Sequence, residues 1–275
     1  MYIVCAVIVI VCGAFLFCIG PNRDRREKMR PFEERYIAHR GLFDNDGPAP
    51  ENSLLAFKKA VEGGYGIELD VQMTTDEKLV VFHDEYLERM CGNGGILCEH
   101  SYEELQQYTL ARSREKIPLL RDVLDIVGGK VPLIVEIKSE GKWKRTCELT
   151  AGMLDGYDGI FCVESFHPFA VGWFRKHRPA YIRGQLSTNY FKDESEKGTP
   201  WAVKFVLTNL LLNFVSRPDF IAYNHKDANV LSYRICRGLF PVENVAWTVK
   251  SRRDLELAEK VFRVIIFDSF IPDAE

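Results

Sequence analysis

The sequence lacks several patterns that would assign it to well-known classes of protein. Its histidines and cysteines do not show the spacing of a zinc site. No basic stripe is present, and 39 acidic residues outnumber 36 Lys and Arg, so nucleic acid is not expected as a partner. Internal repeats and low-complexity linkers are absent as well. With 275 residues, 47% of them hydrophobic, the chain can bury one large core and requires no second domain.

The cysteines do not form an obvious disulfide framework. Three of the eight, Cys5, Cys12 and Cys18, lie in an N-terminal apolar segment, which leaves an odd number at irregular spacing in the rest of the chain. We therefore expect reduced thiols, as in a reducing compartment. A disulfide between Cys91 and Cys98 stays open as the alternative and would contradict that compartment.

Positive charge is missing before the N-terminal apolar run and abundant after it. Ile3–Ile19 carries no charge and approaches the ~20 residues that cross a bilayer. We predict a membrane anchor over residues 1–20 and a basic juxtamembrane tether over 21–35, with cations at positions 23, 25, 26, 28 and 30. The positive-inside rule then places the tether and residues 36–275 in the cytoplasm of a single-pass, N-out membrane protein. A cleaved signal peptide is the less favoured alternative, because it usually has its positive charge before the apolar run.

Three carboxylates interrupt otherwise apolar strands. Glu68 and Asp70 are two residues apart within Ile67–Val71 and therefore share one face of the strand, and Glu136 lies within Leu133–Ile137. Charge on an exposed strand is ordinary, but an uncompensated carboxylate in an apolar strand is costly. The three residues therefore predict a shared divalent cation, Mg²⁺ or Ca²⁺, both of which prefer oxygen ligands.

Two histidines and two cations accompany these carboxylates. His39 and Arg40 end one strand, and Lys138 follows Glu136. The segment Thr74–Lys78 is too short for a crossover helix, so it predicts an antiparallel hairpin that folds His83 back opposite Glu68, or opposite Asp70 if the turn is centred one residue later. A single histidine of this kind is more often a solvated strand end than a catalytic group.

Strands and helices alternate along the chain. Eight predicted strands are Tyr36–His39, Ile67–Val71, Leu133–Ile137, Gly159–Glu164, Tyr181–Leu186, Phe220–Tyr223, Val245–Val249 and Val264–Phe267. Predicted helices cover Leu54–Glu62, Leu119–Val127, Lys142–Leu154, Pro168–His177, Ala202–Val215, Asp227–Gly238 and Arg252–Val261, and a further one begins after Ser101. The alternation predicts a TIM-type (β/α)8 barrel with an accessory hairpin after the second strand, preceded by the N-terminal helix. In such a barrel, His39, Glu68, Asp70 and Glu136 lie at the C-terminal ends of the strands, where TIM-barrel sites form.

The predicted helix Ala202–Val215 has a broad apolar surface that begins next to Trp201. Packing against the barrel is the ordinary interpretation of such a surface. Contact of part of this face with the bilayer is the alternative.

Six segments in order resemble the motifs of the glycerophosphodiester phosphodiesterase family. They are Ala38–Gly41, Pro50–Ser53, Glu68–Val71, Val81–Asp84, Glu136–Lys138 and Trp247–Val249, and the resemblance extends from Tyr36 to Asp273. The chain departs from the family where Ser53 replaces the commoner Thr and where Phe267-Asp268-Ser269 replaces a Thr-Asp-X-Pro pattern.

The resemblance implies metal-dependent hydrolysis of a glycerophosphodiester to glycerol 3-phosphate and an alcohol, in glycerophospholipid catabolism. It implies that Glu68, Asp70 and Glu136 hold one Mg²⁺ or Ca²⁺ and that Arg40 and Lys138 bind the phosphate. The same resemblance gives His39 and His83 the roles of general acid and general base, in an order that stays open, and places Glu51 and Trp247 in the pocket.

Two other functions stay open at this point. A membrane-anchored lysophospholipase D, or a related phosphodiesterase, would act on a lipid in the same barrel. A noncatalytic phosphate-binding membrane protein would need the cations but not the histidines. The alcohol, the acyl-chain tolerance and the oligomeric state do not follow from the sequence.

Overall fold

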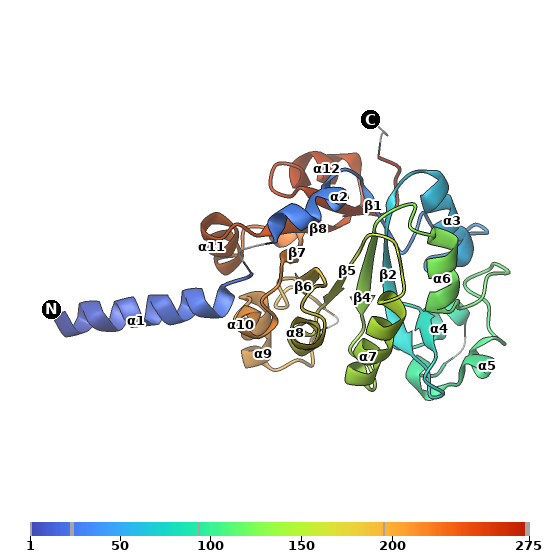
Figure 1. Cartoon of the computed structure of the whole chain (residues 1–275), viewed down its shortest axis with the longest axis horizontal. Coiled ribbons are helices and arrows are strands. Elements are labelled where there is room, and N and C mark those ends of the chain that lie inside the picture. Colours follow the sequence, from blue (N-terminus) through green and yellow to red (C-terminus); the bar gives the residue numbers. More distant parts are fainter. Residues whose placement is uncertain (1, 23–24, 93, 195, 273–275) are drawn as a thin grey trace.

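The computed structural model describes residues 2–22, 25–92, 94–194 and 196–272, and it is a closed barrel of parallel strands surrounded by helices (Figure 1). In this part of the chain the eight barrel strands are β1 (Ile37–His39), β2 (Gly66–Met73), β4 (Leu133–Ile137), β5 (Phe161–Ser165), β6 (Arg183–Ser187), β7 (Phe220–Asn224), β8 (Glu243–Val249) and β9 (Val264–Phe267). Strand β1 pairs with both β2 and β9, which closes the ring. The predicted TIM-type barrel is confirmed.

Strand β3 (Leu79–Val81) lies outside this ring and pairs antiparallel with β2. Its register differs from both predicted registers by one residue. Val71 lies opposite Val81, and the backbone N–H of Phe82 donates to the backbone carbonyl of Asp70. The turn explains the shift. Glu77 adopts a left-handed conformation with φ of 58°, and Thr74 N–H donates to the carbonyl of Lys78 at 3.0 Å.

Most helices begin and end close to the predicted residues. The helices that follow barrel strands or their loops are α3 (Leu54–Glu62), α6 (Leu120–Val127), α7 (Trp143–Leu154), α8 (Pro168–His177), α9 (Trp201–Thr208), α10 (Asn213–Ser216), α11 (Leu231–Leu239) and α12 (Arg252–Ala258). Short helical turns complete the chain at η1 (Arg26–Met29), α2 (Arg30–Glu33), α4 (Glu88–Cys91), η2 (Leu97–Glu99), α5 (Tyr102–Leu105) and η3 (His225–Asp227).

Local sequence accounts for several of these boundaries. Ser53 Oγ accepts the N–H of Ala56 and caps α3, while Ser101 and Glu104 form a capping box at α5. The predicted helix over residues 202–215 is divided into α9 and α10, because Leu210 between them adopts a left-handed φ of 57°.

The barrel interior is filled by apolar side chains that point inward from the strands. Its buried cluster includes Ile134, Phe220 and Val245, together with Met29 and Phe32 from the segment before the barrel. Both of these residues are fully buried, and α2 lies across one end of the barrel (Figure 1). Met29 and Phe32, two residues of the expected tether, therefore pack into the barrel.

Helix α1 (Tyr2–Ile19) projects away from the barrel (Figure 1) and is largely exposed except at its C-terminal end. It is the one helix in the described part of the chain that is long and apolar enough to cross a membrane, a test that a signal sequence also passes. Its 18 residues span about 27 Å. Arg23, one of the cations expected after the apolar run, lies outside the described residues. All eight cysteines are free thiols, Cys91 and Cys98 included.

Candidate active site

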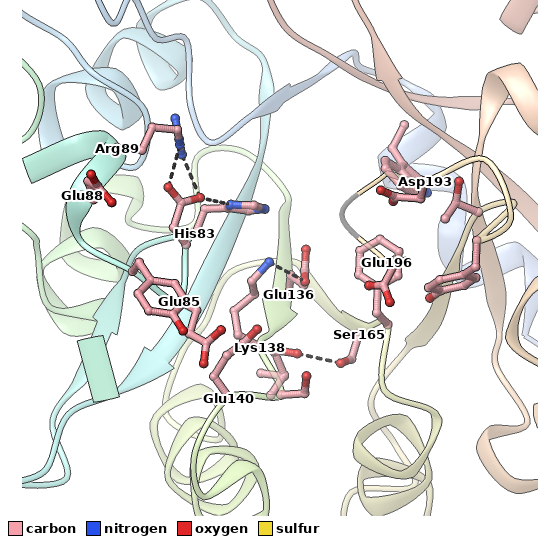
Figure 2. A pocket seen from close by; sticks show the side chains of 18 residues that line it. His83, Glu85, Glu88, Arg89, Glu136, Lys138, Glu140, Ser165, Asp193 and Glu196 are labelled. Atoms are coloured by element: carbon pink, nitrogen blue, oxygen red, sulfur yellow. Dashed lines mark hydrogen bonds and ion pairs between the residues drawn. The ribbon is translucent and has the colours of Figure 1, made fainter. Parts of the chain in front are cut away.

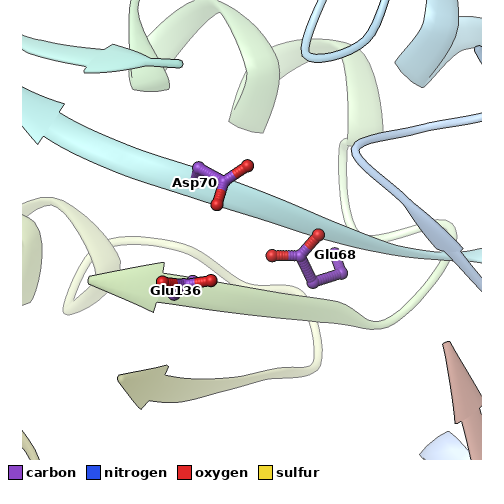
Figure 3. Close-up of side chains that lie close together, drawn as sticks. All are labelled: Glu68, Asp70 and Glu136. Atoms are coloured by element: carbon purple, nitrogen blue, oxygen red, sulfur yellow. The ribbon is translucent and has the colours of Figure 1, made fainter. Parts of the chain in front are cut away.

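The structure brings the three predicted carboxylates together at the C-terminal half of the barrel (Figure 3). Glu68 and Asp70 project from β2, and Glu136 lies beside Asp70 in the register of β2 with β4. One oxygen from each residue lies within 4.8 Å of the other two, and all three side chains are buried. This is the geometry in which several carboxylates can bind one ion.

Burial and mutual repulsion shift the titration of these carboxylates. Burial, with the neighbouring charges of Asp70 and Glu136, raises the pKa of Glu68 well above its usual value. Burial also raises the pKa of Glu136. At Asp70, burial is outweighed by the cations Lys138 and Arg40 and by His83, so its pKa is lowered. Lys138 Nζ lies 3.3 Å from Asp70 Oδ1 and 3.1 Å from Glu136 Oε1.

A fourth carboxylate, Glu164 of β5, belongs to the same cluster and was not predicted. Its side chain is buried, Glu136 and Asp70 add to the effect of burial in raising its pKa, and its Oε2 has no hydrogen-bond partner among the described residues. Glu164 lies within the apolar strand Phe161–Ser165, which is the same sequence signal that identified Glu136. Crowded oxygens with one left unpaired fit a hard divalent cation.

His39 ends β1 and is held from both sides by carboxylates. Its Nδ1 lies 3.0 Å from Asp268 Oδ2, and its Nε2 lies 3.9 Å from Glu68 Oε2. Burial and the nearby Arg40 lower the pKa of His39 to about 4, although Asp268 acts in the opposite direction. The ring is therefore neutral at pH 7. Asp268, which follows directly after β9, has no role among the sequence predictions.

Arg40 adopts a left-handed backbone conformation, with φ of 57°, that turns its side chain toward the carboxylates. Its Nη1 donates to Glu51 Oε1 at 2.6 Å, and its Nε lies 3.4 Å from Asp70 Oδ2. Asn52, another residue without a predicted role, donates from Nδ2 to the same Asp70 oxygen at 2.8 Å. The carboxylate of Asp70 is therefore oriented by Arg40 and Asn52, which follow β1, and by Lys138 at the end of β4.

His83 is oriented by a chain of charged groups. Its Nδ1 lies 2.6 Å from Asp84 Oδ1, and Arg89 contacts Asp84 through Nε at 2.6 Å (Figure 2). Arg89 also donates from Nη2 to Glu51 at 2.6 Å, so Glu51 connects the surroundings of His83 with those of Arg40. Although burial opposes it, the hydrogen bonds from Arg89 and the charge of Arg40 lower the pKa of Glu51 to about 2.

Two adjoining cavities open onto these residues. The smaller, of about 280 Å³, is lined by His39, Arg40, His83 and the carboxylates Glu68, Glu136 and Glu164. The larger, of about 840 Å³, adds Lys138, Glu140, Tyr190 and Glu196 (Figure 2). Trp247 and Phe166 line both, and their rings pack edge to face at 5.2 Å between centroids. The predicted site residues thus line one cleft, except for Asp70 and Glu51. These two line neither cavity but contact Arg40, which does.

Fold and site define a TIM barrel with an acidic, histidine-bearing cleft at the C-terminal ends of its strands. The model of the glycerophosphoryl diester phosphodiesterase family matches residues 39–229, which is more than half of the chain. The chain belongs to this family, and the resemblance noted in its sequence motifs is confirmed.

Curated relatives agree over part of their length. A glycerophosphodiester phosphodiesterase from Bacillus altitudinis is 32% identical over 157 residues, which are 53% of this chain and 63% of that protein. One from Caldanaerobacter subterraneus is 41% identical over 111 residues, 38% of this chain and 44% of that protein. The matched region thus spans about half the length of these relatives.

Solved structures agree with the fold over a longer stretch. A phosphodiesterase from Oleispira antarctica, in complex with the product sn-glycerol-3-phosphate, has a TM-score of 0.68 at 23% identity and covers 86% of this chain and 92% of its own. A glycerophosphodiester phosphodiesterase from Parabacteroides distasonis has a TM-score of 0.66 at 24% identity, with 85% and 92% covered.

Proposed function

We propose that this chain hydrolyses glycerophosphodiesters to glycerol 3-phosphate and an alcohol with the help of one divalent cation, Mg²⁺ or Ca²⁺. Membership of the family supports the reaction. The observation that carries the proposal is that His39 and His83, each paired with its own carboxylate, line the same cavity as Glu68 and Glu136. A site that only binds phosphate would need cations but not two oriented histidines.

The carboxylates Glu68, Asp70 and Glu136 would hold the cation, with Glu164 beside them. When bound there, the cation would supply Lewis-acid stabilisation of the charge that develops on the phosphate. Arg40 and Lys138 would bind the remaining phosphate oxygens. Glu51 fixes the direction of the Arg40 guanidinium, which can bind two phosphate oxygens at once.

His39 would act as general base and His83 as general acid. His39 Nδ1–H donates a hydrogen bond to Asp268, so the Nε2 lone pair is left to take a proton from the attacking oxygen. The attacking group is water or the glycerol hydroxyl of the substrate, the latter through a cyclic phosphate. His83 is turned toward the cleft (Figure 2), and it would donate its proton to the leaving alcohol as the bond from phosphorus to that oxygen breaks.

Trp247 would form the wall that contacts the glycerol part of the substrate. Its ring packs against Phe166 at the junction of the two cavities. Its Nε1 is buried and has no hydrogen-bond partner in the described part of the chain, so a glycerol hydroxyl is a suitable acceptor.

The test is release of glycerol 3-phosphate from glycerophosphocholine by the full chain, with EDTA and after addition of Mg²⁺ or Ca²⁺. His39→Ala and His83→Ala should each lose activity, by about 10² to 10⁴ if each histidine transfers a proton. His177→Ala is the matched control, because His177 is an exposed histidine on α8, outside both cavities, whose ring bonds the carbonyl of Trp173. Full activity in EDTA, or in either site variant, would contradict the proposal.

We also propose that α1 anchors the protein in a membrane, with the N-terminus outside and the barrel in the cytoplasm. The support is the length and apolar character of the helix and the basic residues that follow it. Accessibility of a cysteine introduced at Tyr2 in a variant that lacks the eight native cysteines, measured in intact and in lysed cells, tests the orientation; labelling in lysed cells alone would overturn the N-out assignment.

A lysophospholipid is the second candidate substrate, and one surface favours it. Phe191, Trp201 and Phe205 are exposed and pack ring against ring, at 6.1 Å and 5.3 Å between centroids. Phe191 follows Tyr190, which lines the larger cavity, so this apolar surface borders the cleft. Trp201→Ser should reduce turnover of lysophosphatidylcholine while leaving glycerophosphocholine unaffected, and an equal effect on both would exclude this role of the surface.

A further inference from the structure

A separate cavity of about 710 Å³ lies where α1 joins the barrel. Its lining includes Gly13, Leu16 and Phe17 of α1 and the three arginines Arg175, Arg183 and Arg217. Among the described residues, no acidic side chain lines it. In a chain with a net charge of -3, three guanidinium groups thus face an apolar helix at one place.

The end of α1 is fixed rigidly beside this cavity. Ile19 is fully buried in the main core, and its carbonyl accepts Nδ2 of Asn213 at 2.9 Å. Arg217 Nη1 donates to the carbonyl of Gly20 at 2.7 Å, and a Cβ at Gly20 would lie only 2.8 Å from that nitrogen. The guanidinium of Arg217 also lies over the ring of Phe17, at 4.7 Å from its centroid. The guanidinium of Arg217 is therefore held beside the last turn of α1.

Some of the guanidinium N–H groups of these arginines bond backbone carbonyls and are not available to a ligand. Arg183 donates to the carbonyls of Ser216 and Arg217, and Arg175 Nη1 donates to those of Phe214 and Val215. Arg175 is nevertheless exposed, and in the described part of the chain its Nε and Nη2 have no hydrogen-bond partner. Burial lowers the pKa of Arg183. Asp219, whose Oδ2 lies 3.6 Å from Arg183 Nη1, opposes this shift, and repulsion from Arg25 and Arg175 adds to it. An anion in the cavity would relieve that repulsion.

We propose that this cavity binds the phosphate headgroup of an anionic phospholipid, with Arg175 and Arg217 at the phosphate and Leu16 and Phe17 against the first carbons of the acyl chain. The inference rests on the proposed membrane anchoring of α1. A free phosphate would need the cations but not the apolar wall, which is why a lipid fits the cavity better. Bound there, the lipid would hold the barrel in one orientation against the bilayer.

The test compares lipid retention by the full chain in detergent micelles. Native mass spectrometry counts phosphatidylglycerol and phosphatidylcholine retained at equal concentrations, and we expect one phosphatidylglycerol in preference to phosphatidylcholine. Arg175→Gln should weaken this retention about fivefold, the effect of one interfacial cation. Lys176→Gln is the matched control, because it removes the same charge from the neighbouring exposed position on α8, outside the cavity lining. Equal retention of both lipids, or an equal loss in the two variants, would overturn the proposal.

Two further measurements keep the outcome unambiguous. Arg175→Gln should hydrolyse glycerophosphocholine at the rate of the unmodified chain, which shows that the barrel is folded and separates this site from the catalytic cleft. If neither the unmodified chain nor the variant hydrolyses glycerophosphocholine, the proposed reaction is wrong, but lipid retention still tests the proposed lipid site. Inorganic phosphate should not displace the retained phosphatidylglycerol; displacement would assign the cavity to free phosphate and overturn the lipid source.

Discussion

Replacement of Asp268 by Asn tests how His39 is prepared for proton transfer. Although burial opposes it, the hydrogen bonds from His39 and Ser269 lower the pKa of Asp268 to about 2, so this carboxylate is ionised and can only accept hydrogen bonds. The proton of His39 therefore resides on Nδ1, 3.0 Å from Asp268 Oδ2. An Asn side chain can donate to Nδ1 instead, which favours the tautomer whose Nε2 carries the proton and cannot act as a base.

The size of the effect follows from the contact. His39 becomes positively charged when it accepts a proton, and a unit charge about 4 Å away contributes about 4 kcal/mol at an effective dielectric constant of about 20. This corresponds to about a thousandfold in rate, within the range for a general base. Asp268 lines neither cavity of the described site, so we expect the loss in kcat with little change in KM.

Ser269→Ala is the matched control for this variant. It removes the hydrogen bond from Ser269 Oγ to Asp268 Oδ1, 2.6 Å long, but keeps the carboxylate charge. The loss should stay below about tenfold, because the carboxylate charge beside His39 is kept and a typical hydrogen bond contributes only about 1 kcal/mol net. Nitrogen-15 NMR of labelled His39 reports the tautomer independently of turnover. Wild-type kcat in Asp268→Asn, or an unchanged tautomer in it, would refute the reasoning.

Three further predictions concern the buried carboxylates. Glu51→Gln should lower the free energy of unfolding at pH 7 by at most about 3 kcal/mol, because the pKa of Glu51 falls from 4.5 to about 2 on folding. Urea unfolding measures this difference between the variant and the wild-type chain. The difference should disappear as the pH falls from about 4.5 to about 2, because the wild-type carboxylate becomes protonated. Glu164→Gln should weaken activation by Mg²⁺ or Ca²⁺ by about 10- to 100-fold with little change of kcat at saturating cation, measured by titration of activity; unaltered cation affinity would exclude Glu164 from the cation's surroundings. Glu68→Gln should raise the melting temperature in EDTA, because it removes a carboxylate whose pKa is raised by burial and repulsion, and should lose the stabilisation that added cation gives the wild-type chain in a thermal melt.

Much of the barrel and part of the site follow from local sequence. The strands Leu133–Ile137 and Val264–Phe267 have the predicted bounds because short apolar runs end there at polar residues. Helix Leu54–Glu62 is likewise fixed by a Ser cap and a following glycine. Glu68 and Glu136 were recognisable because a carboxylate in an apolar strand is costly. Glu164 carries the same signal and could have been found by applying the argument to β5.

Other features depend on contacts between residues far apart in sequence. Asp268 follows the last strand and resembles an ordinary turn residue until the closed barrel brings it to His39, 229 positions earlier. Local patterns also do not show that Arg89 bonds Glu51 or that Ile19 is held by Asn213. The hairpin register depended on a single left-handed residue, Glu77, which is not a residue type that favours this conformation.

The most direct test of the proposed reaction is phosphorus-31 NMR of glycerophosphocholine during incubation with the full chain. With Mg²⁺ or Ca²⁺ present, we predict that the diester signal is replaced by that of glycerol 3-phosphate, and that EDTA, His39→Ala and His83→Ala each prevent this. Formation of phosphocholine would mean that the other ester bond is cleaved. Undiminished conversion in EDTA would mean that the reaction needs no cation bound by the carboxylates. Either result would contradict the proposed reaction.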